Sequence, residues 1–436
     1  MTDTDLTDSD TSGAHRPDVA GTGEPAPASV ATDLQDERLR TGSGLRGALA
    51  GTVDRVRGGD LGLLPVLGGL VVIWGVLQAL NPIFLSSRNL SNLLMECAPV
   101  GVIALGVVCV LLVGQIDLSV GSISGLSAAV LAVLFVGQGR PAVLAIAAAV
   151  LLGGAVGWVY AQAFNRLGVP SFVVTLAGLL ALLGIQIKVL GAAGSINLPF
   201  DSSLVFFAQQ AFVPTWLAYV LSLAGAGGLL AVGLLHSRRR RAAGLSATSL
   251  PVLLTRSGAL LAVLLLAVWY LGRARGIGWM FVLFVALVLV LHYALTSTGW
   301  GMSVFAVGGN PEAARRAGID VRAIYTSTFV LAATLAAVGG VLAASRLAAA
   351  NQSSGGGDVN LTAIAAAVIG GTSLFGGRGS AFAALLGILV IQSISSGLTL
   401  LNLDSSYRFI VTGVVLLLAV ALDSVARRSR ASSGRA

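Results

Sequence analysis

Apolar runs of about 16–25 residues alternate with short polar or glycine-containing breaks from Leu61 onward. A helix needs about 20 apolar residues to cross a bilayer, and unpaired backbone groups in lipid are costly, so the runs read as helices. The pattern predicts an all-α membrane protein, a polytopic helical bundle of about 12 transmembrane helices. The expected spans are 62–80, 94–113, 118–137, 141–164, 171–191, 211–235, 249–271, 278–296, 324–345, 360–375, 381–401 and 406–423.

The two ends of the chain lack this pattern. Residues 1–60 are rich in Asp, Thr, Ser, Gly and Pro, and no secretory signal precedes the first strongly apolar run. We therefore predict three regions: a disordered cytoplasmic tail at 1–60, a transmembrane domain at 61–425 and a cytoplasmic C-terminal tail at 426–436.

Composition narrows the class of protein. Hydrophobic residues make up 56% of the 436 residues and charged residues only 11%, against about 25% charged in soluble domains. The net charge is +8, but residues 1–60 carry −5 and residues 61–436 carry +13 on only eight acids. These figures exclude an ordinary soluble domain, a disordered protein and a nucleic-acid-binding protein, and they require a body that faces lipid.

The distribution of basic residues predicts the orientation, because cytoplasmic loops carry an excess of Lys and Arg. With the N-terminal tail inside, twenty basic residues fall on the cytoplasmic side and seven on the other. Arg273 and Arg275 oppose the rule in the hairpin 249–296. We expect a multi-pass protein of the cell membrane with both termini in the cytoplasm.

The position of the single lysine excludes a phosphate-binding loop for ATP. A phosphate-binding loop needs Gly-Lys-Ser/Thr, whereas Lys188 lies between Ile187 and Val189. Any ATP drive is therefore expected from another subunit. The three histidines share no local spacing, so we predict no metal and no cofactor.

The first break with chemical content is Gly114–Ser122, which holds Gln115, Asp117, Ser119 and Ser122 between two apolar runs. A carboxylate near membrane depth is expensive, so Asp117 should face a cavity, a partner or the aqueous edge. Two interpretations can coexist: Asp117 caps the helix that starts at Leu118, or it contacts a polar solute.

A second break, Gly370–Ser380, contains Thr372 and Ser373 between two apolar runs. Paired interruptions, one in each half of a chain, indicate a transport pathway, so we expect glycine-broken helices in each half. The alternative is a glycine-rich turn that lets helices approach closely.

The segment Gly308–Ile319 predicts a short charged helix in a cytoplasmic loop. Asn310 and Pro311 start a turn and helix, Glu312 favours its positive end, and Gly318 can end it. Because Ile319 is its only strongly apolar residue, docking on a cytoplasmic subunit is favoured over lying in the membrane. The run Arg238–Arg241 is interpreted as a topology determinant near anionic lipid headgroups.

Several segments resemble the permease subunits of bacterial ABC monosaccharide importers. Gln115–Ser122 is similar to the Gly-Gly-Ile-Asp-Leu-Ser-Val-Gly-Ser signature of that family, and Val169–Leu176, Gly308–Ile319 and Ile369–Gly377 resemble further family segments in the same order. The Glu-Ala-Ala…Gly pattern of importer coupling loops matches Glu312 to Gly318. The long insertion at 211–296 is most similar to the xylose-type branch, which is larger than the ribose type.

The resemblance implies a transport subunit without ATPase activity of its own, which moves xylose or a similar simple sugar. It implies a cytoplasmic ABC ATPase, an extracytoplasmic sugar-binding protein and a second permease copy as partners, in addition to membrane lipids. The implied ATPase-coupling residues are Asn310, Pro311, Glu312, Ala313, Ala314, Arg315, Arg316 and Gly318. The candidate residues of the substrate pathway are Gln115, Asp117, Ser119, Ser122, Phe172, Thr175, Asn360, Thr362, Thr372 and Ser373.

The chain departs from the family pattern in two places. Gln115 replaces the second glycine of the signature, and Asn360–Ala365 lacks both carboxylates of the usual Glu-Leu-Asp-Ala-Ile-Ala. The second change puts the usual sugar, or the contact with the binding protein, in question, although Asn360 and Thr362 still offer hydrogen bonds to hydroxyl groups.

Two other classes remain as alternatives. An ion-coupled secondary sugar carrier would use Glu96 and Asp117 as intramembrane carboxylates, but it has no need for a docking helix at 311–318. A membrane-embedded enzyme would need a nucleophile with its base, or metal ligands, and the sequence offers neither set.

Overall fold

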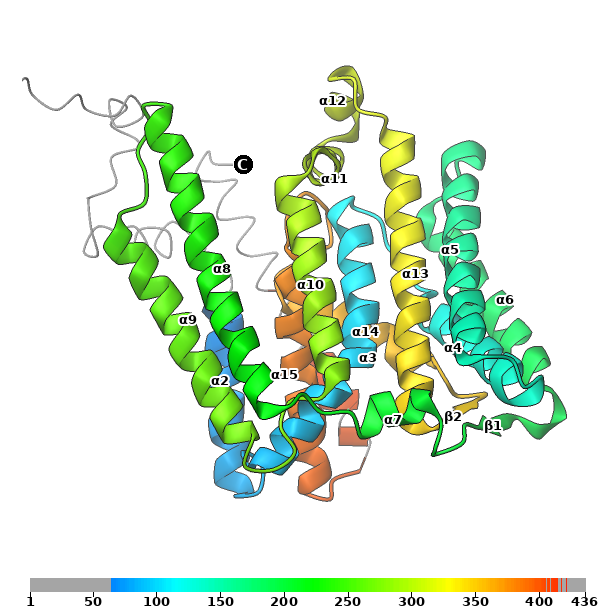
Figure 1. The fold of residues 1–436 in the computed structure, drawn as a ribbon. Helices are drawn as coiled ribbons and strands as arrows, with labels where there is room; N and C mark the ends of the chain where they lie inside the picture. The colour runs from blue at the N-terminus through cyan, green and yellow to red at the C-terminus, as the bar shows by residue number, and fades with distance from the viewer. Residues whose placement is uncertain (1–63, 405, 408, 415–416, 418–420, 422–436) are drawn as a thin grey trace, which may run out of the picture.

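The computed structural model describes residues 64–421, except 405, 408, 415, 416 and 418–420. The described part is dominated by helices (Figure 1). Its elements are α2 (Leu64–Leu80), α3 (Ser87–Leu112), α4 (Val120–Ala132) with a π-helical extension η3 (Val133–Gly137), α5 (Ala142–Leu167), α6 (Ser171–Leu190), a 3₁₀ turn η4 (Gly191–Ala193), β1 (Ser195–Asn197), α7 (Ser203–Gln209), α8 (Thr215–Ala242), α9 (Leu250–Leu271), α10 (Trp279–Ser297), α11 (Gly299–Gly309), α12 (Pro311–Arg316), α13 (Val321–Leu347), β2 (Ala349–Asn351), α14 (Gly357–Ile369) and α15 (Ala381–Leu400).

The prediction of a polytopic all-α membrane protein is confirmed. Nine helices in the described part are long and apolar enough to cross a membrane, and two shorter apolar helices fall in α2 and α14. The predicted number of twelve is therefore not reproduced as such, and the last predicted span, 406–423, lies partly outside the described residues. The predicted tails at 1–60 and 426–436 lie outside them entirely.

The break at Gly114–Ser122 precedes a short helix, and the break at Gly370–Ser380 follows one. α4 and α14 each have 13 residues, which corresponds to about 20 Å of helix and is less than the hydrocarbon core of a bilayer. The π-helical turn η3 lengthens α4, whereas α14 stops at Ile369 because the chain turns at Gly370 and Gly371. The structure thus has a glycine break beside a short helix in each half of the chain.

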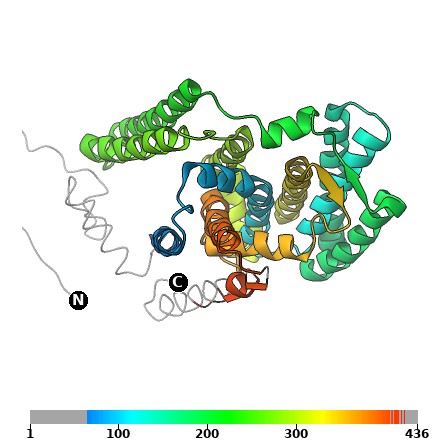
Figure 2. The same ribbon diagram turned by 90° about the horizontal axis from the view of Figure 1, so that it is seen from below.

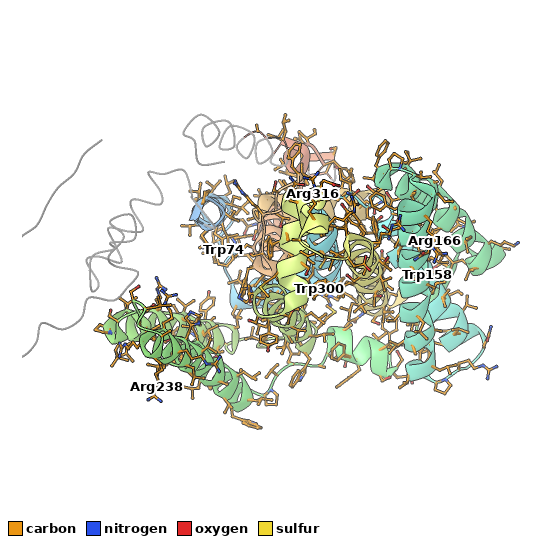
Figure 3. All side chains as sticks on the ribbon, turned by 90° about the horizontal axis from the view of Figure 1, so that it is seen from above. Trp74, Trp158, Arg166, Arg238, Trp300 and Arg316 are labelled. Atoms are coloured by element: carbon orange, nitrogen blue, oxygen red, sulfur yellow. The ribbon has the colours of Figure 1, made fainter. Side chains whose placement is uncertain are left out.

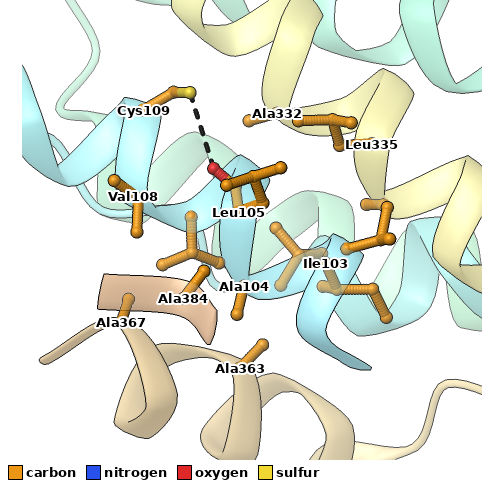
Figure 4. Packing of buried hydrophobic residues seen from close by; sticks show 14 of the residues in the cluster. Ile103, Ala104, Leu105, Val108, Cys109, Ala332, Leu335, Ala363, Ala367 and Ala384 are labelled. Carbon is orange, nitrogen blue, oxygen red and sulfur yellow. Dashed lines mark hydrogen bonds between the residues drawn. The ribbon is translucent and has the colours of Figure 1, made fainter. Parts of the chain in front are cut away.

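α3 forms the centre of the bundle. In its most apolar window 83% of residues are buried, against 17% in α8. α13 packs along α3, α4 and α5. Figure 4 shows Leu105 and Ile103 of α3 close to small residues of its neighbours, which let the helices approach. Those neighbours include Ala332, Ala363, Ala367 and Ala384.

A small two-stranded sheet lies at one side of the end of the bundle opposite α12 (Figure 1). β1 and β2 pair antiparallel, with Ile196 opposite Ala350. The sheet ties the segment after α6 to the segment after α13, and the view from below places both strands beside the end of α13 (Figure 2).

The α8–α9 pair lies at the periphery. The two helices pack on each other, and the lower end of α9 meets the bundle where the Tyr270 hydroxyl donates a 2.9 Å hydrogen bond to the Leu85 carbonyl. Seen from the α12 end, Arg238 lies on this outer pair and Arg316 lies over the middle of the bundle (Figure 3).

Candidate functional site

Both glycine breaks meet the loop that carries α12. The backbone N–H of Gly377 donates a 2.9 Å hydrogen bond to the carbonyl of Leu112, which joins the second break to the end of α3. A Cβ at Gly376 would lie 2.7 Å from the Gly308 oxygen and 2.9 Å from the Gly114 nitrogen. Three backbone segments from distant parts of the chain are therefore in direct contact just below α12.

Glycine is required at this crossing. Gly376 has a φ of +85°, and a side chain at Gly308 would overlap the Leu112 carbonyl. A displacement of the loop that carries α12 must therefore displace the backbone of both breaks, because no flexible side chain lies between the loop and the breaks.

The helix α12 is short, exposed and capped. The Asn310 side-chain oxygen accepts 3.0 Å hydrogen bonds from the backbone N–H groups of Glu312 and Ala313, as expected for an N-cap. Glu312 pairs with Arg315 at 2.7 Å and with Arg316 at 3.5 Å. These side chains are more than half exposed, so the pairs contribute little stability and the charges are free to meet a partner.

One face of α12 anchors it to the bundle. Ala314 is buried, Gly318 has a φ of +86°, and the N–H of Ile319 donates a 3.1 Å hydrogen bond to the Ala314 carbonyl. α12 therefore begins at Pro311 and ends at Arg316, close to the sequence prediction.

Two aromatic side chains pack between α5 and the start of α13. Tyr325 of α13 is buried, and its ring meets Phe164 of α5 edge-on with 4.9 Å between the ring centroids. Gln115, the residue that departs from the family signature, is half-buried in the first break.

Asp117 sits in a buried polar cluster between α4, α5 and α6. Its Oδ1 accepts hydrogen bonds from the backbone N–H of Ser119 at 2.8 Å and from the Ser119 hydroxyl at 2.7 Å. Thr175 of α6 accepts a 3.2 Å hydrogen bond from the N–H of Leu118, and the Tyr160 hydroxyl lies in the field of Asp117. α4 begins at Val120, two residues after the predicted start, so Asp117 holds the turn before the helix and does not cap its first residues.

The start of α4 packs closely against the chain that leads into α14. The side-chain oxygen of Asn360 accepts a hydrogen bond from the N–H of Gly121, and a Cβ at Gly121 would collide with that oxygen and with the Gly355 carbonyl. Gln186 of α6 donates hydrogen bonds to the carbonyls of Asn351, at 3.0 Å, and Ser354, at 2.9 Å. The two halves of the bundle are therefore linked at this point by side-chain amides.

The other predicted pathway residues are scattered. Ser122 is buried in α4, and Thr372 and Ser373 are buried in the second break, where the N–H of Ser373 donates to the Arg378 carbonyl at 3.0 Å. Thr362 is half-buried on α14, and Phe172 is exposed on α6. The Phe172 carbonyl accepts a 3.4 Å hydrogen bond from the Thr175 hydroxyl, whereas the Phe172 side chain is exposed.

The sequence prediction did not include Tyr160, Gln186 and Tyr325. Gln186 was detectable, because it is an amide in the apolar run 171–191, where polar side chains are costly unless they are bonded. Within the described ranges, no group of three or more His, Cys, Asp or Glu residues could hold a metal ion.

Comparison with known proteins gives a consistent result. A family model described as branched-chain amino acid transport system / permease component matches residues 89–420. The xylose transport system permease protein XylH of Escherichia coli strain K12 is 35% identical over 350 residues, covering 79% of this chain and 87% of XylH. The corresponding protein of Haemophilus influenzae is 34% identical over 353 residues, covering 78% of this chain and 90% of its own length.

A ribose permease matches nearly as well. The ribose import permease protein RbsC of Escherichia coli strain K12 is 32% identical over 355 residues, covering 81% of this chain and 91% of RbsC. No solved structure matches this chain.

Proposed function

We propose, since the chain belongs to the family described as branched-chain amino acid transport system / permease component, that it is the transmembrane permease subunit of an ATP-driven importer of monosaccharides. The observation that carries the proposal is the backbone crossing of Gly308, Gly376 and Leu112 beneath α12. It gives an exposed docking helix direct mechanical access to both glycine breaks.

A simple sugar is the proposed substrate, with xylose first. The support is that the relatives are named for xylose and ribose, and that the identity is 35% to XylH and 32% to RbsC. The polar groups beside the first break are hydroxyls, amides and the Asp117 carboxylate, all of which can form hydrogen bonds with a neutral polyhydroxyl solute. Asp117, Ser119, Thr175 and Asn360 are the proposed pathway residues with the strongest support, because they lie where the first break meets α6 and α14.

Each proposed partner has its own place and task. A cytoplasmic ABC ATPase would dock on α12, where Glu312, Arg315 and Arg316 are exposed. An extracytoplasmic binding protein would deliver sugar to the opposite end, and a second copy of the chain would complete the membrane unit. The proposed orientation places α12, both termini and the end of α8 with Arg238–Arg241 in the cytoplasm.

Coupled transport means that α12 has two positions, and that the ATPase binds them with different affinities. When the ATPase domains close, α12 would move, and the rigid crossing would pass that movement to Gly114 and to Gly376. The short helices α4 and α14, which begin and end at these breaks, are the elements that would then shift around the solute.

The test is uptake by cells that express the chain with its cognate ATPase and binding protein. Radiolabelled D-xylose, D-ribose, D-allose and L-leucine are offered in parallel, with ATP depletion and proton-gradient collapse as separate treatments. We expect ATP-dependent sugar uptake, largest for xylose, and none of leucine. Glu312→Ala should reduce uptake about tenfold or more, because it removes the exposed carboxylate that would meet the ATPase, while the protein stays in the membrane.

Asp201→Asn serves as the matched control, since Asp201 is an exposed carboxylate between β1 and α7, far from α12. Normal uptake by Glu312→Ala would refute the coupling role. Uptake that survives ATP depletion and disappears with the proton gradient would instead establish the ion-coupled carrier.

A further inference from the structure

A second polar cluster lies at the end of the bundle opposite α12, away from both glycine breaks. Glu96 of α3, Arg346 of α13 and Gln392 of α15 meet there. Arg346 is the second-last residue of α13, directly before β2, which places the cluster beside the small sheet. Three separate helices thus contribute one polar side chain each.

Within the cluster, Glu96 is held closely by Gln392 and only loosely by Arg346. The amide of Gln392 donates a 2.6 Å hydrogen bond to Glu96 Oε2. Arg346 Nη2 stands 4.0 Å from Glu96 Oε1, at the limit of an ion pair. The Arg346 backbone is in turn held by a 2.9 Å hydrogen bond that its carbonyl accepts from the Gln209 side chain of α7. This contact positions the backbone of Arg346, while its guanidinium reaches Glu96 only at 4.0 Å.

The two charged side chains of the cluster are partly exposed. The side chain of Glu96 is 45% exposed and that of Arg346 is 26% exposed, although Met95 and Cys97 on either side of Glu96 are buried. A carboxylate and a guanidinium in contact with lipid would be costly, so the exposed surface must face an aqueous opening. An exposed ion pair at this distance contributes little to the stability of the fold. A role in stability therefore does not explain why these two charged side chains are present.

The polar surface continues towards the nearby end of the bundle. About two turns earlier on α3, the Asn89 side-chain oxygen accepts a 3.1 Å hydrogen bond from Ser396, which lies one turn after Gln392 on α15. Two successive pairs of polar side chains therefore join α3 and α15. Asn89–Ser396 lies nearer the end of the bundle, and Glu96–Gln392 lies deeper within it. A solute that enters here meets hydrogen-bonding groups in sequence.

We propose that Glu96, Arg346 and Gln392 form a recognition site for the hydroxyl groups of the incoming sugar, at the extracytoplasmic mouth of the chain. The carboxylate accepts hydrogen bonds from hydroxyl groups, and the guanidinium and amide donate them, which together match the two-way hydrogen bonding of vicinal hydroxyls. The inference rests on the proposed transport of sugars. No group assigned to the glycine breaks or to α12 takes part in this site.

The test compares Glu96→Gln and Arg346→Gln in the full importer with its ATPase and binding protein. D-xylose, D-ribose and D-allose uptake and binding-protein-stimulated ATP hydrolysis are measured on the same membranes. We expect sugar uptake to fall about tenfold at low sugar concentration, with a changed preference among the three sugars, while stimulated ATP hydrolysis stays within about twofold. Asp404→Asn, an exposed carboxylate just after α15, is the matched control and should leave both activities unchanged.

Three results would overturn the inference. Unchanged uptake and preference in Glu96→Gln would show that the cluster does not contact sugar. Parallel loss of uptake and of stimulated ATP hydrolysis would assign the cluster to docking of the binding protein. Rescue of both activities by the charge-exchanged variant Glu96→Arg/Arg346→Glu would show a structural ion pair. Absence of sugar uptake by the unaltered chain would refute the proposed function itself, and the inference with it.

Discussion

Two neighbouring glycines of α11, Gly308 and Gly309, have opposite surroundings. Comparing them separates the effect of close packing from the effect of backbone freedom. A Cβ at Gly308 would overlap the Leu112 carbonyl and lie 2.7 Å from the Gly377 nitrogen, whereas a Cβ at Gly309 would meet nothing within 4 Å. Both residues are helical and neither has a positive φ. The sequence alone presents them as an equivalent pair, because the difference depends on a contact with residues almost 70 or 200 positions away.

This difference makes a residue-scale prediction. Gly308→Ala should destabilise the protein by about 1–3 kcal/mol and abolish most sugar uptake, because the crossing beneath α12 must open to admit a methyl group. Gly309→Ala should be neutral, or stabilising by up to about 1 kcal/mol through helix propensity. Thermal unfolding of the purified proteins in mild detergent measures both effects. Equal behaviour of the two variants would contradict the close crossing.

The candidate residues show which features of the site can be predicted from the local sequence. Asp117, Ser119 and Asn310 could be identified because a carboxylate or a cap residue in a break needs a local hydrogen-bond partner, and each has one. Thr175 and Asn360, which bond the backbone of the first break at Leu118 and Gly121, come from other helices. Their proximity depends on tertiary packing, which no local pattern encodes.

The elements with a strong apolar period were predicted within a few residues. Three ends differ more, among them that of α8, which runs on to Ala242 past the predicted 235; the other two have identifiable reasons. α3 begins at Ser87, well before the predicted 94, because Ser86 caps it and its first turns are polar. α14 ends at Ile369, before the predicted 375, because Gly371 turns the chain with a φ of +100°.

Elements without such a period were missed. β1 and β2 have three residues each, too few for an alternating pattern, and each is held by a partner more than 150 residues away. α7 has only seven residues. The sheet and α7 could be found only once α6 and α13 had both been placed against α4.

At the scale of the element, the N-cap of α12 makes a prediction. A six-residue helix is marginal by itself, so the two hydrogen bonds accepted by Asn310 should decide whether it forms. Asn310→Ala should cost about 1 kcal/mol locally and reduce binding-protein-stimulated ATP hydrolysis, because the docking helix frays. Asn310→Asp keeps the acceptor and should remain close to the unaltered protein. Titration of purified ATPase onto membranes, with ATP hydrolysis as the readout, would detect the difference, and equal titrations for the two variants would rule out the capping role.

For the whole molecule, the positive charges and the position of α12 together predict the orientation. Cys97 and Cys109 are both buried, so a cysteine introduced at the surface should be the main reactive thiol. Asp201→Cys, near β1, should react with a membrane-impermeant thiol reagent in intact cells, whereas Ala317→Cys, just after α12, should react only after the membrane is opened. Labelling in the opposite pattern would invert the proposed orientation.

The overall architecture was the most predictable level, because apolar length and low charge leave few alternatives to a helical bundle in lipid. The arrangement within it was less predictable. Nothing in the local sequence places α3 in the centre and α8, which is also long and apolar enough to span a membrane, at the edge, because the difference lies in which faces carry small residues that fit a neighbour.

The central place of α3 has a consequence for how the chain is made. Its largest partner, α13, follows about 210 residues later. At elongation rates of about 5–20 residues per second, a ribosome needs roughly 10–40 s to cover that distance. During this interval α3 is already in the membrane, with Glu96 and an internal Pro99 and without the helix that covers it. The newborn chain therefore depends on the insertion machinery, or on temporary helix pairs, to shelter its future core until synthesis reaches α13.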